Sequence, residues 1–250
     1  MRKKYRPPSK AAILLLCAGI VGIVYFTALI AIDLVKDWLD KAYYASLPAS
    51  FTPIDDSASL ETSRVFAVDF EAVQKEAPDA EAWIRIDGTV IDYPVMYGKD
   101  NEYYLTRLPN GKKSKSGSIF IDYRNAPDFS DANTLIHGHH MRSGAMFGTL
   151  KNYAKQSFYD NHRTAYISTP EKNFEVMLFA GYKLDHTVEI PPLTFKDAKD
   201  FDKYIRDIKR RSIFKSDVEV TAGDRLVCLA TCDYSFDNSR LVIVGKLIEK

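Results

Sequence analysis

An apolar run near the start is the first clear pattern along the chain. Residues 11–32 are almost all apolar, interrupted only by Thr27 and two glycines. A helix needs roughly 20 apolar residues to cross the hydrocarbon core of a bilayer, so this run predicts a transmembrane anchor. A cleaved signal peptide is the alternative, but its apolar region is usually only about 7–15 residues long.

Beyond the apolar run the pattern is mixed. Residues 33–45 combine apolar and charged side chains at helical spacing, which predicts an amphipathic continuation of the helix that ends before Pro48. Residues 46–63 are rich in Ser, Thr, Pro and Asp and are expected to form a tether. We therefore expect four parts: a basic tail at 1–10, the anchor at 11–32, the amphipathic helix and linker at 33–63, and one folded domain at 64–250.

Within the folded domain the pattern is that of short strands. Residues 83–86 and 89–95 flank Asp87-Gly88, which is a favoured hairpin turn. Further candidate strands lie at residues 118–123, 134–136, 165–168, 174–184, 218–220, 226–231 and 241–248. This many short strands with turn signals predicts a mainly β fold, either a closed barrel or a sandwich.

Three helices are predicted to accompany the strands. The first is capped by Asp69 and runs through Ala77, and the second covers residues 147–157, where apolar side chains share one face. The longest covers residues 195–211, with Thr194 and Asp197 arranged as a capping pair. It is inserted between strands, and its Lys and Arg side chains are most simply a solvated face, with an acidic partner as the alternative.

Charge divides the chain at the anchor. Basic residues alone precede the apolar run, at Arg2, Lys3, Lys4, Arg6 and Lys10. Such a flank favours the cytoplasmic side, so we expect a single-pass protein with its N-terminus in the cytoplasm and its domain outside the cell. The other 29 Lys and Arg against 33 Asp and Glu give a net charge of −4, which does not suggest nucleic-acid binding.

The three cysteines are too few for a disulfide framework. Cys17 lies in the apolar run, while Cys228 and Cys232 are four residues apart in one predicted strand. At ~3.3 Å per residue the latter two would be some 13 Å apart, too far to bridge. A free thiol on an exported domain suggests catalysis, although a buried structural cysteine is the common alternative.

Two strand ends carry the candidate chemistry. Cys232 ends the apolar stretch 229–232, and Arg240 opens the next strand after a polar loop. A nearby cation favours the thiolate, which is the reactive form. Upstream, the strand 134–136 runs into Gly138 and His139, and a histidine at a strand end can transfer a proton to or from the reacting groups.

A zinc site is the competing interpretation of the histidines. His137, His139 and His140 have a spacing that resembles metal ligands. The remaining two histidines, His162 and His186, come with no metal-binding pattern, so we expect neither a metal nor a cofactor.

These strand ends resemble those of the sortase family, the membrane-bound transpeptidases of Gram-positive bacteria. The shared features are Leu-Ile-x-Gly-His at one strand end, Leu-Ala-Thr-Cys at another, and Arg after seven further residues. The resemblance covers residues 65–250 and is greatest for class B, which has helices before the barrel and a long helix between the penultimate strands. It implies a closed sortase-type β-barrel.

The resemblance also implies residue roles. His139 corresponds to the catalytic histidine, Cys232 to the nucleophile and Arg240 to the residue that stabilises the oxyanion. Implied substrate-binding residues are Asn101, Leu105 and Thr231. By residue type alone, a turn asparagine at 101 and a core leucine at 105 are interpretations of equal weight. The chain departs from the class B pattern at His137 and His140, where members often have an aromatic residue and Asn.

The implied activity is cleavage of a sorting signal of the Asn-Pro-x-Thr-x type after Thr. The acyl group would pass through a Cys232 thioester to an amine of the peptidoglycan precursor, so the implied partners are surface proteins with sorting signals and that precursor. A pilin-polymerising sortase, another extracytoplasmic cysteine peptidase and a non-enzymatic β-domain scaffold are the alternatives. A cysteine phosphatase is excluded because it requires Cys-x5-Arg, and the caspase signature Gln-Ala-Cys-x-Gly is absent.

Overall fold

The protein is described here by a computed structural model, which covers residues 9–47, 52–53, 66–185, 190–232 and 239–250. The chain forms two compact units, Met1–Ala45 and Ser46–Lys250. The first unit is helical and the second contains the barrel, so each is treated separately below.

Helix α1 (Lys10–Ser46) joins the predicted anchor and the predicted amphipathic segment in one continuous helix. None of its side chains is buried, although most of its first half is apolar. The only polar side chain within the apolar run is Thr27, and its hydroxyl donates to the carbonyl oxygens of Ile23 and Val24, each at 2.9 Å. In the described chain, α1 is the one helix long and apolar enough to cross a bilayer.

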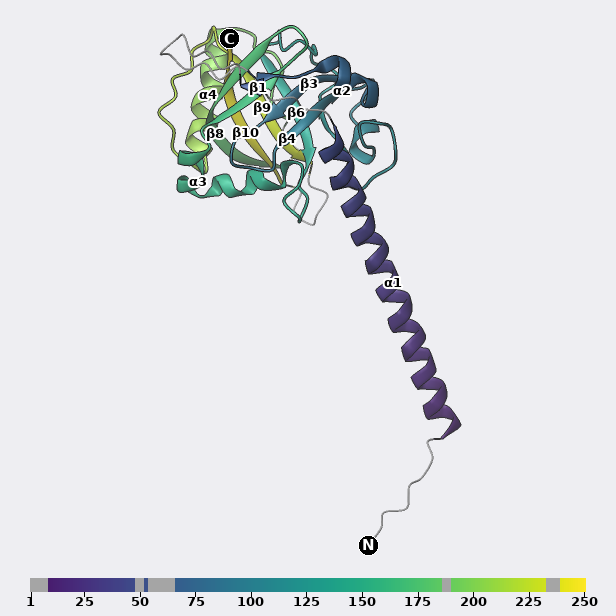
Figure 1. The fold of residues 1–250 in the computed structure, drawn as a ribbon. Coiled ribbons are helices and arrows are strands. Elements are labelled where there is room, and N and C mark those ends of the chain that lie inside the picture. The colour runs from purple at the N-terminus through teal and green to yellow at the C-terminus, as the bar shows by residue number, and fades with distance from the viewer. Residues whose placement is uncertain (1–8, 48–51, 54–65, 186–189, 233–238) are drawn as a thin grey trace. The chain divides into compact units, whose positions relative to one another are not determined.

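The second unit is built on a closed eight-stranded barrel with the strand order β10-β8-β7-β3-β4-β5-β6-β9 (Figure 1). Its strands are β3 (Ala80–Arg85), β4 (Asp92–Tyr97), β5 (Ile119–Ile121), β6 (Asn133–His139), β7 (Thr164–Ser168), β8 (Asn173–Asp185), β9 (Arg225–Cys232) and β10 (Ser239–Glu249). Neighbouring strands are antiparallel except in the pairs β4–β5 and β6–β9, which are parallel. The prediction of a closed barrel is therefore confirmed.

Two parts of the chain differ from the expected strand pattern. Part of the predicted tether is ordered, because β1 (Thr52–Pro53) pairs with β2 (Phe66–Ala67). The predicted strand at 218–220 is wrong: that stretch pairs with no neighbouring strand. Lysine side chains satisfy its carbonyl groups instead, since Lys209 Nζ lies 2.8 Å from the Val218 oxygen and Lys246 Nζ lies 3.3 Å from the Glu219 oxygen.

The helices follow the predictions with two changes. Helix α2 (Phe70–Glu76) is capped by Asp69, as expected, and the segment after β6 forms a 3₁₀ helix, η2 (Phe147–Ala154), and then α3 (Gln156–Asn161). Helix α4 (Ala198–Arg211) begins later than predicted, and the capping pair with Thr194 is wrong. Asp197 alone caps α4, since its carboxylate accepts from the Asp200 N–H at 2.9 Å.

Helix α4 covers the strands that carry the candidate site. Its apolar residues Phe201, Ile205 and Ile208 belong to one buried cluster with residues of β6, β8, β9 and β10. From β6, β9 and β10 the cluster takes Leu135, Leu226, Cys228, Ala230, Val242 and Val244. Close packing on these strands fixes their positions, so the residues at their ends are held by a rigid base.

Candidate active site

The parallel pairing of β6 with β9 brings two predicted site residues together. Its register aligns Leu135 with Cys228 and, four residues further along each strand, His139 with Cys232. Residues aligned across neighbouring strands share a face, and paired strands lie about 4.8 Å apart. Position 232 is placed by this strand register alone, and residues 233–238 lie outside the described residues.

Arg240 joins the same face from the other side of β9. The antiparallel ladder between β9 and β10 ends at Ala230 with Val242. Continued for two more residues, the same register would bring Arg240 level with position 232. Arg240 is half-buried, and its Nε atom is buried without a hydrogen-bond partner among the described residues. A buried donor normally has a partner, so this group is suited to bind an oxygen atom that a substrate would supply.

His139 is oriented by a backbone carbonyl group. Its Nε2 atom lies 2.6 Å from the Leu105 oxygen. Because a carbonyl oxygen only accepts hydrogen bonds, Nε2 must carry the hydrogen, and neutral His139 is then the tautomer with an unprotonated Nδ1. The ring can thus exchange a proton at Nδ1 while the Leu105 carbonyl holds the other nitrogen.

Gly117 allows this carbonyl to approach. The residue has φ +57°, and a Cβ atom there would lie 2.5 Å from the Leu105 oxygen and 2.9 Å from His139 Cδ2. Its neighbour Ser118 donates its backbone N–H to the Tyr104 oxygen at 2.8 Å, which holds the 3₁₀ helix η1 (Tyr103–Thr106) against this position. Only glycine fits here without strain.

Gly138 has a comparable role on the other side of His139. A Cβ atom at Gly138 would lie 2.7 Å from Cδ2 of Phe147, the first residue of η2. The Phe147 ring therefore packs directly against the backbone of the strand end. This contact is a physical reason for glycine before the histidine.

His137 lies two residues before His139 and has a charged partner. Its Nε2 atom is 3.1 Å from Asp122 Oδ2, and both side chains are almost fully buried. Burial alone would raise the pKa of Asp122, but hydrogen bonds from Arg124 and His137 hold that pKa well below its ordinary value. Asp122 is thus a buried carboxylate anion, and neither it nor Gly117 was identified from the sequence.

The predicted substrate-binding residues have the following contacts. Asn101 donates to Asp122 Oδ2 at 2.9 Å and accepts from the Tyr123 N–H at 3.0 Å. Leu105 is half-buried and contacts His139 through its carbonyl group. Thr231 is buried, and its hydroxyl bonds with the backbone N–H and carbonyl of Leu241 on β10. A role for any of them in substrate binding stays a prediction.

Cys228, the other cysteine of β9, is a buried residue. Its thiol is fully buried, donates to Asn133 Oδ1 at 3.3 Å, and lies 3.7 Å from the Tyr204 hydroxyl. Burial raises the pKa of Cys228 to about 11, so this thiol stays protonated at neutral pH. Cys228 is therefore a structural residue of the α4 cluster.

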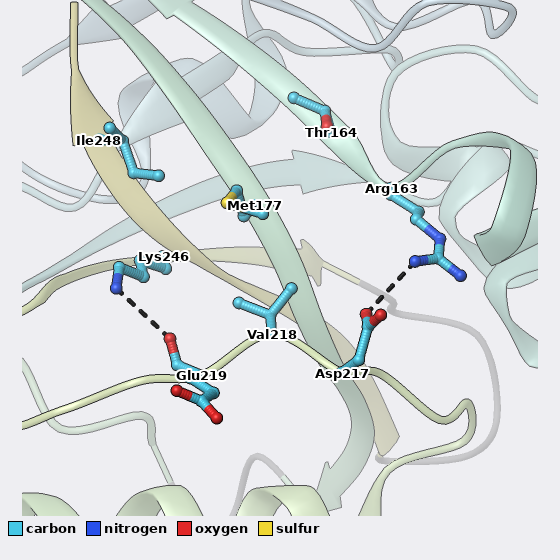
Figure 2. A pocket seen from close by; sticks show the side chains of 8 residues that line it. All are labelled: Arg163, Thr164, Met177, Asp217, Val218, Glu219, Lys246 and Ile248. Carbon is cyan, nitrogen blue, oxygen red and sulfur yellow. Dashed lines mark hydrogen bonds and ion pairs between the residues drawn. The ribbon is translucent and has the colours of Figure 1, made fainter.

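Two other features bear on alternative sites. In the described parts of the chain, no three His, Cys, Asp or Glu side chains are arranged to hold a metal ion; His186 lies outside those parts. A surface hollow is lined by residues of β7, β8 and β10 together with Val218 and its neighbours (Figure 2). Lys246 in this hollow is six residues from Arg240, about 20 Å along β10, so the hollow is separate from the candidate site.

The buried Asp122 carboxylate predicts how the fold responds to acid. Since its folded pKa lies below the unfolded value of about 4, its charge stabilises the fold above that pH, and this contribution is lost as the pH falls further. We expect the free energy of unfolding of the full chain in detergent to decrease between about pH 5 and pH 2 more steeply than in Asp122→Asn. Equal slopes for the two proteins would contradict a charged Asp122.

Comparisons with known proteins show the family to which the chain belongs. A family profile described as a sortase domain matches residues 84–248. The chain is 36% identical over 197 residues to sortase B of Listeria monocytogenes, which covers 78% of this chain and 80% of that protein. It is 32% identical over 232 residues to sortase B of Staphylococcus aureus, which covers 92% of this chain and 93% of that protein.

Solved structures agree in fold. The Staphylococcus aureus sortase B–substrate complex matches with a TM-score of 0.76 at 31% identity, covering 86% of this chain and 99% of that one. Sortase B of Bacillus anthracis in complex with AAEK1 matches with a TM-score of 0.73 at 32% identity, covering 87% and 100%. The chain therefore belongs to the sortase family of cysteine transpeptidases, and its relatives are sortases of class B.

Proposed function

We propose that Cys232, His139 and Arg240 form the catalytic site of this transpeptidase. The observation that carries the proposal is the register of β6 and β9, which pairs His139 with position 232. The β9–β10 ladder, continued beyond Ala230 and Val242, supports a place for Arg240 at the same level. A thiolate, a proton carrier and a fixed cation are the groups that acyl transfer through a thioester requires.

In the first half reaction the Cys232 thiolate attacks the carbonyl carbon of the signal's threonine. The negative charge moves to the carbonyl oxygen, where Arg240 donates hydrogen bonds. As the C–N bond breaks, Nδ1 of protonated His139 gives its proton to the departing amine. The Leu105 carbonyl can keep its hydrogen bond during this transfer, because Nε2 carries a hydrogen in both charge states.

In the second half reaction an amine of the cell-wall precursor attacks the thioester. His139 takes a proton from that amine at Nδ1, and the thiolate leaves as the amide forms. The enzyme returns to its starting protonation state, so one histidine serves as acid and then as base.

For the substrate we propose a sorting signal of the Asn-Pro-x-Thr-x type. The support is the similarity to class B sortases along most of the chain. Asn101, Leu105 and Thr231 are the proposed substrate-binding residues. The support for Leu105 and Asn101 is that the Leu105 carbonyl contacts His139 and that Asn101 is four residues before it, in the segment that leads into η1.

We further propose that α1 anchors the enzyme in the cell membrane, with the N-terminus in the cytoplasm and the barrel outside. The support is the apolar first half of α1 and the basic residues that precede it. This placement puts the thiol on the same side of the membrane as the growing cell wall.

The proposed nucleophile is tested by removing each barrel thiol in turn. Full-length enzyme in detergent is incubated with an Asn-Pro-x-Thr-x peptide and an amine, and the products are identified by mass. We expect cleavage after Thr and amine transfer in the wild type, and neither in Cys232→Ala. Cys228→Ala is the matched control and should retain transfer, since its thiol is buried and protonated. Transfer by Cys232→Ala would contradict the proposal.

Arg240 is tested by its effect on kcat. Loss of one oxyanion donor typically costs about 10²–10³ in kcat, so we expect a decrease of this size in Arg240→Ala. Arg225→Ala removes an arginine at the other end of the barrel wall, paired with Glu249, and serves as the control. Equal kcat values in the two variants would argue against oxyanion stabilisation by Arg240.

The close approach at Gly117 predicts a large effect from one methyl group. Gly117→Ala would force the Leu105 carbonyl and His139 apart, so we expect kcat to fall on the order of 100-fold. Gly144→Ala is matched in backbone strain, since Gly144 has φ +85°, but nothing lies within 4 Å of its added Cβ. If both substitutions lower kcat equally, backbone strain and not the contact with His139 is responsible.

A further inference from the structure

The carboxylate of Asp122 is the most heavily hydrogen-bonded group near the site. Arg124 donates to it three times: from its backbone N–H at 3.1 Å and its Nε at 2.8 Å to Oδ1, and from Nη2 at 2.8 Å to Oδ2. Asn101 Nδ2 at 2.9 Å and His137 Nε2 at 3.1 Å share Oδ2. The side chain of Asp122 is only 1% exposed, so water does not compete for these bonds.

These bonds link two segments that meet again at His139. On one side Asp122 holds His137, which lies on β6 two residues before His139. On the other side it holds Asn101, which is four residues before Leu105. The Leu105 carbonyl in turn binds His139, so a closed ring of covalent and hydrogen bonds passes through both the carboxylate and the candidate catalytic histidine.

Local bonds make the segment between Asn101 and Leu105 stiff. Asp100 Oδ1 accepts from the backbone N–H groups of Glu102 and Tyr103, both at 2.8 Å. The Tyr104 oxygen accepts from the Ser118 N–H at 2.8 Å. A displacement of Asn101 would therefore be passed on to the Leu105 carbonyl.

We propose that Asp122 is a positioning residue for catalysis: by holding His137 and Asn101 together, it keeps the Leu105 carbonyl on Nε2 of His139 and so sets the reactive tautomer of that ring. Its negative charge is needed because five donor groups converge on two oxygen atoms. Asparagine would offer one acceptor oxygen and would turn an N–H₂ group toward other donors, so one arm of the ring would open.

Two substitutions interrupt this ring of bonds, and a third serves as the matched control. Asp122→Asn removes the charge. Asn101→Ala removes the bond from Asn101 to Asp122, together with the bond that Asn101 accepts from the Tyr123 N–H, and leaves the carboxylate with Arg124 and His137. Asp131→Asn is the control: Asp131 lies on the same β5–β6 connection and accepts from Asn125 Nδ2 and the Ala126 N–H, both at 2.7 Å, without contact to this ring.

The direct readout is the tautomer of His139 in the substrate-free, full-length enzyme in detergent. The chain has five histidines, and ¹⁵N-histidine labelling distinguishes protonated from unprotonated ring nitrogens in NMR spectra. At about pH 8.5, two units above the ordinary histidine pKa, His139 in the wild type and in Asp131→Asn should show hydrogen on Nε2. We expect a mixture of tautomers in Asp122→Asn and in Asn101→Ala.

The kinetic readout rests on the proposed function. We expect kcat of Asp122→Asn to fall on the order of 10–100-fold, because the bonds that position His139 are weakened, while Asp131→Asn should keep the wild-type kcat. Two results would overturn the positioning role even if the enzyme transfers peptides. One is a wild-type His139 with its hydrogen on Nδ1, and the other is an unchanged His139 tautomer in both Asp122→Asn and Asn101→Ala. A tautomer change without any peptide transfer by the wild type would support the positioning role and contradict the proposed function.

Discussion

The parallel pairing of β6 with β9 is the constraint on which the site depends. These strands are far apart in sequence, and the barrel closes only because they lie side by side. Their register puts His139 beside position 232, and the ladder from β9 to β10 adds Arg240. A shift of one residue would turn each side chain to the other face, so the proposed site depends on this register.

Two histidines on this strand end illustrate how a partner determines a role. His137 is buried against a carboxylate, which holds its ring in place by charge and hydrogen bonding. His139 is half-buried against a carbonyl group, which orients the ring without adding a negative charge. Strand alternation puts both on one face, and His139, the outer of the two, is the one proposed for catalysis.

The amino-acid sequence was sufficient to predict the elements that depend on local patterns. The apolar run of α1, the barrel strands, the Asp69 cap and the long helix α4 are all present close to where they were expected. Two predictions were wrong. The stretch at 218–220 pairs with no strand, and lysine side chains from other parts of the chain bind its carbonyl groups. At the start of α4 two residues were candidate caps, and Asp197, not Thr194, caps the helix.

The sequence could not predict the surroundings of His139, because they are made by backbone atoms. The Leu105 carbonyl has no residue-type signature, and the need for glycine at 117 arises only when η1 and β6 are brought together. Asp122 had a signal that could have been used, since an acidic residue directly follows the apolar run Ile119–Ile121. Its partners His137 and Asn101 come from separate segments, so its role required the fold.

The central claim is that the residues aligned by β6, β9 and β10 form one acyl-transfer site. The most direct measurement is the intact mass of the full-length enzyme after brief exposure to an Asn-Pro-x-Thr-x peptide without an amine, followed by acid quenching and peptide mapping. The proposed site predicts a thioester of the signal's N-terminal portion on Cys232 in the wild type and its loss in His139→Ala. A stable adduct on Cys228, or turnover without any covalent adduct, would contradict the claim.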